Sequence, residues 1–289
     1  MTGPVLIVGA AGRLGASVVD AFAGVDVIAH TRATLDIADP EAVRKVIGEA
    51  APAAIINCAA FNDVDGAEDH PVSAFAVNAF AVRSLVRSAE ACGAPFVHFG
   101  TDFVFDGEVE EPYSESVDPA PKSVYGLSKL LGEWFALEGR QAFVLRVESL
   151  FGAPVGWTGR AGSLDSIITS LEKGREVRVF TDRVVSPSYV HDVARAVRYL
   201  LETNAAPGLY HCVNDGHATW HDVAKEAARL LGVQPRLRCV TVDQVVFRAP
   251  RPRYCALAGG KLAEAGFTMP PWNEALRRWL TSAGRGEIT

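Results

Sequence analysis

The sequence predicts an α/β protein: a doubly wound, Rossmann-type parallel sheet with a smaller C-terminal substrate-binding lobe. Three observations support this. Short, wholly apolar runs alternate with helix-like segments through the first half of the chain, which is typical of a parallel sheet covered on both faces. A glycine-rich turn directly follows the first run. After Phe151 the regular alternation gives way to shorter segments rich in glycine and polar residues.

The elements of the first half follow from these runs and from the residues at their ends. Strands are expected at residues 4–8, 25–29, 54–57, 96–99 and 142–147. Helices are expected between and after them, over residues 16–23, 40–50, 71–92 and 125–138. Asp39 stands at an N-cap position with Pro40 in the first turn, and Gly93 closes the long third helix.

The second half is expected to form the smaller lobe. We place a dinucleotide-binding domain at residues 1–150 and a substrate-binding lobe, interleaved with it, at 151–289. The clearest later elements are a strand near 209–213 and a helix over 220–231. In such folds a ligand lies in the crevice at the carboxyl ends of the strands.

Composition excludes several classes of protein. The 289 residues carry a net charge of −6, which argues against bulk binding of nucleic acid. No run of about 18 or more apolar residues occurs, so no membrane span is expected. The five cysteines are odd in number and lack C-x-x-C spacing, which argues against structural zinc and a disulfide framework. A reducing cytoplasm fits this pattern.

The glycine-rich turn predicts a dinucleotide site. Gly9 would form the tight turn, Gly12 would let the backbone approach a pyrophosphate, and Gly15 would let the helix pack closely on the strand. The free N–H groups at the start of the helix would face the phosphates. The alternative is that this segment is only a turn, but its place between a strand and a helix favours the cofactor.

The end of the second strand bears on the choice of cofactor. NAD sites usually place a carboxylate there, whereas this chain has His30 and Thr31 followed by Arg32. Arg13 lies inside the glycine loop. Two guanidinium groups near the ribose would favour a 2′-phosphate, so NADP(H) is preferred and NAD(H) remains possible. The alternative is that both are solvated surface arginines.

Tyr125 and Lys129 form the candidate catalytic pair. They are four residues apart at the start of a helix and therefore share one face. A neighbouring ammonium is expected to lower the pKa of the phenol, which could then act as general acid toward a carbonyl. Thr101 follows the fourth strand and could hold the same carbonyl oxygen. Alone, a Tyr-x-x-x-Lys spacing would be ordinary helix surface; the glycine motif and Thr101 favour catalysis.

Together these motifs resemble the extended short-chain dehydrogenase/reductases, and within them the dTDP-4-dehydrorhamnose reductase (RmlD-like) family. The similar stretches span nearly the whole chain: Gly9 to Gly15, Asn57 to Ala60, Phe61 to Glu68, Thr101 to Gly107, Glu111 to Glu115, Pro119 to Pro121, Tyr125 to Lys129, Ser186 to Asp192 and Pro270 to Leu276. The resemblance implies a Thr101–Tyr125–Lys129 triad.

The resemblance also implies which residues bind cofactor and substrate. Cofactor contacts are implied for Gly12, Arg13, Leu14, Asp36, Ile37, Ala59, Ala60 and Phe61. Substrate contacts are implied for Thr101, Asp102 and the second lobe. Asp36 could equally be a turn residue. Arg248, Arg251 and Arg253 could clamp a diphosphate in the second lobe or form an exposed basic loop, and both interpretations stay open.

Three positions depart from the family pattern. Gly100 precedes Thr101 where the family usually has serine. After the fifth strand, Ser149 replaces a tryptophan that stacks on the substrate, and Glu148 adds a charge. We expect Ser149 to leave more room beside the sugar ring. Some members join a magnesium-linked dimer through an acidic residue early in the first helix; Ala16 and Ser17 offer none, so no metal is expected.

The leading hypothesis is NADPH-dependent reduction of the ketone of a 4-keto-6-deoxy nucleotide sugar, in a chain that could form a homodimer. One alternative is a sugar-nucleotide epimerase or dehydratase. A dehydratase commonly has Asp-Glu after the threonine, whereas this chain has Asp102-Phe103. The other alternative is a non-catalytic NADP-binding subunit similar to the regulatory subunit of methionine adenosyltransferase.

Overall fold

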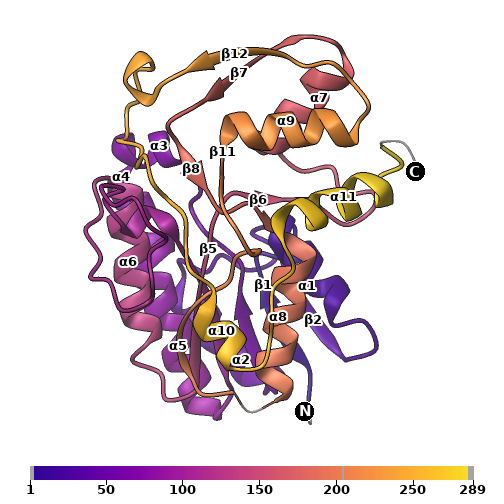
Figure 1. The fold of residues 1–289 in the computed structure, drawn as a ribbon. Coiled ribbons are helices and arrows are strands. Elements are labelled where there is room, and N and C mark those ends of the chain that lie inside the picture. The colour runs from indigo at the N-terminus through magenta and orange to yellow at the C-terminus, as the bar shows by residue number, and fades with distance from the viewer. Residues whose placement is uncertain (1–2, 204, 286–289) are drawn as a thin grey trace.

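The central sheet has the predicted parallel architecture. The computed structural model describes residues 3–203 and 205–285. Every strand pair in the sheet is parallel, and the order is β10-β5-β4-β3-β1-β2 (Figure 1). The strands are β1 (Val5–Val8), β2 (Val27–His30), β3 (Ala54–Asn57), β4 (Phe96–Thr101), β5 (Ala142–Val147) and β10 (Gly208–His211).

Helices cover both faces because successive side chains of each strand point to opposite sides. On β1, Val5 and Ile7 pack in one apolar cluster with α1 (Arg13–Ala21) and α8 (Val190–Glu202). Leu6 and Val8 pack in another with α2 (Pro40–Ala50) and α5 (Ala81–Cys92). The wholly apolar strands therefore belong to the middle layer of a three-layer fold.

Local signals set several helix ends. The Asp39 side chain accepts hydrogen bonds from the N–H groups of Glu41 and Ala42, and so caps α2 as expected. Gly93 ends α5 in the left-handed region, with φ of 72°. α6 (Val124–Ala136) begins at an N-cap Ser123, which accepts from the Gly126 N–H.

The helix expected over 71–92 is not continuous. It consists of α4 (Pro71–Phe75), a π-helical turn η1 (Ala76–Phe80) and α5. Within that turn Asn78 accepts from the Phe61 N–H at 2.8 Å, and its amide donates to Phe61 O and Ser128 Oγ. The wider turn thus places one amide between the loop after β3 and α6, which helical periodicity does not reveal.

The second lobe lies at the top of Figure 1, above the carboxyl ends of β4 and β5. Its strands form three two-stranded sheets, β12 with β7, β11 with β8 and β6 with β9. Their bounds are β6 (Leu150–Phe151), β7 (Glu176–Phe180), β8 (Val184–Val185), β9 (Ser188–Tyr189), β11 (Ala218–Thr219) and β12 (Arg236–Val240). The remaining helices are α3 (Val64–Asp69), η2 (Asp102–Val104), α7 (Ser163–Glu172), α9 (Trp220–Leu230), η3 (Val242–Gln244), α10 (Gly260–Glu264) and α11 (Trp272–Ser282).

The chain beyond residue 150 does not stay in this lobe. It returns as α8, which packs beside α1, and as β10, which extends the central sheet next to β5. Part of the chain beyond residue 150 therefore belongs to the layers of the central sheet. Within the described residues, no helix combines the length and apolar character needed to cross a membrane. All five cysteines are free thiols.

Candidate functional site

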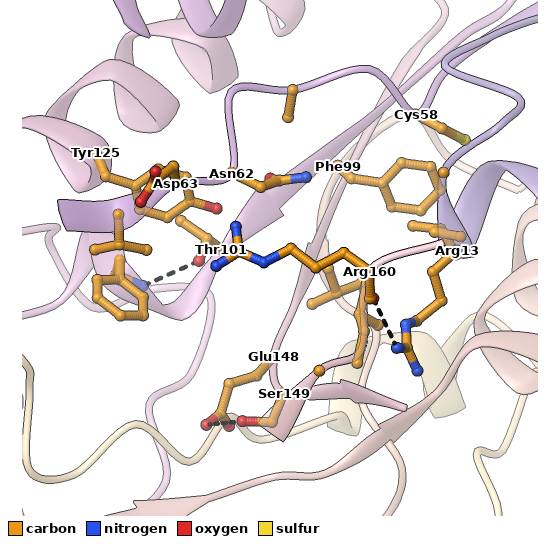
Figure 2. A pocket seen from close by; sticks show the side chains of 18 of the residues that line it. Arg13, Cys58, Asn62, Asp63, Phe99, Thr101, Tyr125, Glu148, Ser149 and Arg160 are labelled. Atoms are coloured by element: carbon orange, nitrogen blue, oxygen red, sulfur yellow. Dashed lines mark hydrogen bonds between the residues drawn. The ribbon is translucent and has the colours of Figure 1, made fainter. Parts of the chain in front are cut away.

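A cavity of about 850 Å³ lies at the carboxyl ends of β1, β3, β4 and β5, beneath the second lobe. Figure 2 shows side chains from both halves of the molecule pointing into it. The strand ends and the helices behind them contribute Gly12, Arg13, Leu14, Ala59, Ala60, Thr101, Asp102, Tyr125, Lys129, Glu148 and Ser149, among others. The second lobe contributes Trp157, Arg160, Ser166 and Arg251.

The glycine loop has the geometry of a phosphate cradle. Gly9 has φ of 75°, and a Cβ there would come within 2.4 Å of the Ala59 nitrogen. A Cβ on Gly15 would come within 2.2 Å of the Gly9 carbonyl oxygen. Gly12 is the N-cap of α1 and offers no side chain to the first N–H groups, which border the cavity. These features fit a bound pyrophosphate.

Arg13 does not point its donors where we expected. Its guanidinium donates to Gly152 O at 2.9 Å and to the Asp165 carboxylate at 2.5 Å, and it stacks 5.0 Å from the Trp157 ring. It borders the cavity but joins the glycine loop to the second lobe. Protein acceptors therefore use the Arg13 donors in this arrangement, and its role toward a 2′-phosphate stays a prediction.

The segment after β2 lies outside the cavity. Arg32 is exposed in the turn that follows β2. Asp36 accepts from the Ala38 N–H at 3.0 Å, as a turn residue does, and Ile37 is buried in the core. Phe61 lies behind the cavity wall, held by Asn78. Gly9 and Gly15 shape the glycine loop from behind, whereas Gly12, Leu14, Ala59 and Ala60 line the cavity as expected.

The three candidate catalytic residues meet in the cavity. Thr101 is the last residue of β4, Tyr125 lies in the first turn of α6, and Lys129 follows one turn later. All three are buried and line the cavity. The Thr101 hydroxyl donates to Asp102 Oδ1 at 3.0 Å, and Lys129 Nζ donates to Phe99 O at 2.6 Å. The strand end and the helix start thus place a hydroxyl, a phenol and an ammonium at one wall.

The electrostatics differ from the expectation for Tyr125. Burial raises the pKa of the phenol, the charge of Asp102 raises it further, and a hydrogen bond with Thr101 lowers it. The pKa of Tyr125 is therefore raised, whereas the spacing to Lys129 had predicted a lowered one, and Lys129 is not among the groups that shift it. Burial in turn lowers the pKa of Lys129 to about 8, while the charge of Glu133 raises it. The phenol is therefore a protonated acid at neutral pH.

A buried ion pair explains the departure at Gly100. Arg146 on β5 donates to both carboxylate oxygens of Glu133 on α6, with its shortest contact at 2.8 Å. A Cβ on Gly100 would lie 2.1 Å from Glu133 Oε1, so even the smallest side chain would collide with the pair. The serine usual in the family does not fit beside this carboxylate.

A second buried group was not predicted from the sequence. It contains one carboxylate oxygen of Asp102, one carboxylate oxygen of Glu148 and the Cys255 sulfur. These three atoms all lie within 4.8 Å of one another. The guanidinium of Arg183 lies beside them. Burial raises the pKa of both carboxyls, and the charge of Arg183 lowers it by a smaller amount. A cation is disfavoured here because the guanidinium already supplies positive charge. The sequence signal was the unexpected charge at Glu148.

The three clustered arginines each pair with a different aspartate. Arg248 pairs with Asp69, Arg251 with Asp65 at 2.8 Å, and Arg253 with Asp243. Only Arg251 reaches the cavity, and a second cavity of about 760 Å³ has Arg251 and Arg253 in its wall. Nearby aspartates thus hold the three guanidinium groups at different places, and of the three Arg251 is the one that borders the main cavity.

Sequence reasoning also missed Arg160. It belongs to the glycine-rich stretch after Phe151, which carries no regular pattern. Figure 2 shows its side chain extending into the cavity. Its backbone carbonyl accepts from Arg13 at 3.4 Å, which ties this stretch to the glycine loop.

Comparisons with known proteins identify the family. A family model described as "RmlD substrate binding domain" matches residues 2–284. The spore coat polysaccharide biosynthesis protein SpsK of Bacillus subtilis is 33% identical over 279 residues, which cover 96% of each chain. A dTDP-4-dehydrorhamnose reductase of Streptomyces griseus is 35% identical over 283 residues, or 95% of this chain and 90% of that protein.

Solved structures agree. A dTDP-4-dehydrorhamnose reductase of Bacillus anthracis, in complex with NADP, matches with a TM-score of 0.91 at 31% identity, covering 98% of this chain and all of that one (100%). A UDP-glucose 4-epimerase of Thermus thermophilus matches with a TM-score of 0.81 at 22% identity over 96% of this chain and 98% of that one, which shows a shared fold alone. The match over almost the whole chain and the relatives above 30% identity show that this chain belongs to the RmlD substrate-binding-domain family.

Proposed function

We propose that this chain reduces the C4 ketone of a 4-keto-6-deoxy nucleotide sugar with NADPH. The observation that carries the proposal is the meeting of Thr101, Tyr125 and Lys129 in a cavity whose opposite wall is a glycine cradle. The reductases named among the relatives support this reaction class, and an NADP complex of one of them supports the cofactor.

Each proposed catalytic residue has one task. The bound nicotinamide cofactor supplies a hydride equivalent. Thr101 and Tyr125 hold the ketone oxygen by hydrogen bonds, and Tyr125 donates its proton to that oxygen as negative charge develops. Lys129, fixed by the Phe99 carbonyl, places a positive charge beside the phenol and stabilises the phenolate that remains.

We place the cofactor along Gly12, Leu14, Ala59 and Ala60, with Arg32 as the candidate partner for a 2′-phosphate. The exposed guanidinium of Arg32 follows β2, where adenosine ribose is read in such folds. Arg32→Ala should raise the KM for NADPH about ten- to a hundredfold and leave NADH much as it was. A wild-type preference for NADH would show that this end of the site reads a ribose hydroxyl.

The substrate side is proposed to hold the sugar at Thr101, Asp102 and Ser149 and the diphosphate near Arg251 and Arg160. Both guanidinium groups line the cavity, whereas Arg248 is turned away. A screen of nucleotide-linked 4-keto-6-deoxy sugars, followed by the absorbance of NADPH, tests the reaction. Equal kcat/KM values for a nucleotide-linked and a free keto-sugar would show that the nucleotide is not read.

The regulatory alternative makes the opposite prediction. A non-catalytic subunit would bind NADPH, turn over none of these sugars and co-purify with a larger enzyme. A homodimer also stays a prediction, which light scattering during size-exclusion chromatography would check.

A further inference from the structure

Asp102 and Glu148 leave the sheet side by side. In the parallel ladder Thr101 on β4 pairs with Val147 on β5, so the two acidic residues are the next residues of neighbouring strands. Both are buried and line the cavity, and Asp102 is adjacent to the proposed ketone-binding Thr101. The two carboxyls therefore lie together, next to the place where the reacting carbonyl would lie.

This pair has unused hydrogen-bonding capacity. Glu148 Oε2 accepts from the Ser186 N–H at 2.5 Å, but Oε1 has only the Ser149 hydroxyl at 3.4 Å. Asp102 Oδ2 is buried and has no nitrogen or oxygen partner among the described residues, and the donor beside this carboxyl is the weak thiol of Cys255. A buried carboxyl oxygen without a partner is costly. Ser149, next in the chain, has φ of 42°, a left-handed conformation that also costs free energy in a serine.

The charges do not balance either. Two carboxyls face one guanidinium, Arg183, and the neighbouring groups Cys255 and Tyr125 carry no positive charge at neutral pH. Burial raises the pKa of both carboxyls, and each negative charge raises the pKa of the other groups around it. One proton shared between the carboxyls restores neutrality with Arg183. The pair then offers one O–H donor and several acceptors, which is the set that a single hydroxyl group uses.

The proposed pose identifies which hydroxyl this is. With the C4 ketone at Thr101 and Tyr125, the groups beside it are those on C3 and C5. In a 6-deoxy pyranose C5 carries a methyl group and the ring oxygen, and C3 can carry a hydroxyl. A methyl against two buried carboxyls would leave them unsatisfied, whereas a hydroxyl would both donate to and accept from them.

We infer that Glu148, together with Asp102, binds the hydroxyl on C3 of the sugar, so that the chain selects keto-sugars that retain this hydroxyl. The inference rests on the proposed function and narrows its substrate class. Glu148 is the specificity-determining residue, because its carboxyl supplies the group that the rest of the family pattern lacks at this position.

The test compares two substrates in each variant: a nucleotide-linked 4-keto-6-deoxy sugar and its 3-deoxy analogue. A site built around a hydroxyl rejects the analogue that lacks it strongly, so wild type should show a kcat/KM ratio of about 10²-fold or more. Glu148→Leu should lower this ratio to below about fivefold, by losing the hydroxylated substrate and not the deoxy one. Asp192→Asn alters a buried carboxyl outside the cavity and should leave the ratio unchanged.

The outcomes are distinguishable. A wild-type ratio near one, an equal loss of both activities in folded Glu148→Leu, or deuterium uptake at C3 or C5 from D₂O would overturn the inference and leave the reductase intact. No turnover of either sugar by wild type would overturn the proposed function itself. If Glu148→Leu fails to fold, Glu148→Gln serves: its amide still offers a donor and an acceptor to the hydroxyl, so it should keep the ratio, and loss of the ratio in this folded variant would overturn the inference.

Discussion

The Glu133–Arg146 pair joins α6 to β5, whereas the Asp102–Glu148–Arg183 group lies just beyond the ends of β4 and β5; all of these side chains are buried except Arg183, which is partly buried. In the first, one carboxylate meets one guanidinium through three hydrogen bonds. In the second, two carboxyls share one guanidinium, and Asp102 Oδ2 and Arg183 Nε lack partners among the described residues.

The difference separates structure from function. A matched, fully bonded pair fixes α6 against β5 and leaves nothing for a ligand to bind. A mismatched group that borders the cavity keeps polar atoms without matched partners, which is the arrangement expected beside a ligand site. Charge matching is therefore a useful criterion for judging whether a buried ionic group supports the fold or the site.

The largest effect is expected at the acid that faces the mismatched group. Tyr125→Phe removes one proton and little else, so turnover should fall by about 10²–10⁴-fold while NADPH binding stays nearly intact. Steady-state kinetics and fluorescence titration of the cofactor measure the two effects. Turnover within a few fold of wild type would reject Tyr125 as the acid.

Breaking the matched pair should act on stability. Arg146→Met leaves the Glu133 carboxylate buried without its partner, which should lower the free energy of unfolding by about 3–5 kcal/mol. Removing both charges, in Glu133→Leu with Arg146→Met, should restore most of that loss because no unpaired charge remains. Urea denaturation measures both variants, and a double variant as unstable as the single one would contradict this view of the pair.

The matched pair is also expected to affect catalysis, because the charge of Glu133 acts on the pKa of Lys129. Because the pKa of Lys129 is lowered to about 8, its ammonium loses its proton as the pH rises above that value. We expect kcat/KM to fall by about tenfold per pH unit there. Glu133→Gln removes a charge that raises the pKa of Lys129 and should shift the decline to lower pH. An unshifted profile would separate Glu133 from this titration.

The smallest effect is expected on the pH dependence of protein stability, through Glu148 of the mismatched group. Burial raises the pKa of Glu148, so above the ordinary glutamate pKa the folded chain keeps a proton that the unfolded chain releases. Stability should then fall as the pH rises through the pKa of the folded state. Glu148→Gln cannot titrate, so its melting temperature should gain on that of wild type by about a few degrees as the pH rises from the ordinary glutamate pKa through the raised pKa of the folded state. Parallel curves for the two proteins would show that Glu148 is ionised throughout.

Much of the fold and part of the site could be predicted from local sequence. Apolar runs located the five strands of the first half, and Asp39 and Gly93 marked helix ends, because these signals act within a few residues. Gly9, Gly15 and the Tyr125–Lys129 spacing likewise depend only on neighbours in the chain. Arg13 and the three arginines of the second lobe could not be placed this way, since their partners Asp165, Asp65, Asp69 and Asp243 come from elsewhere in the sequence.

By itself, then, the sequence determined the doubly wound sheet, the glycine cradle and the spacing of the proposed catalytic residues, because hydrophobic periodicity and backbone geometry act over short distances. Only the tertiary structure decided what those residues meet. The parallel register of β4 and β5 brings Asp102 beside Glu148, and the loop before β8 supplies Arg183. Electrostatic interactions in a buried site act through space, so the partners of each charge become known only when the chain has folded.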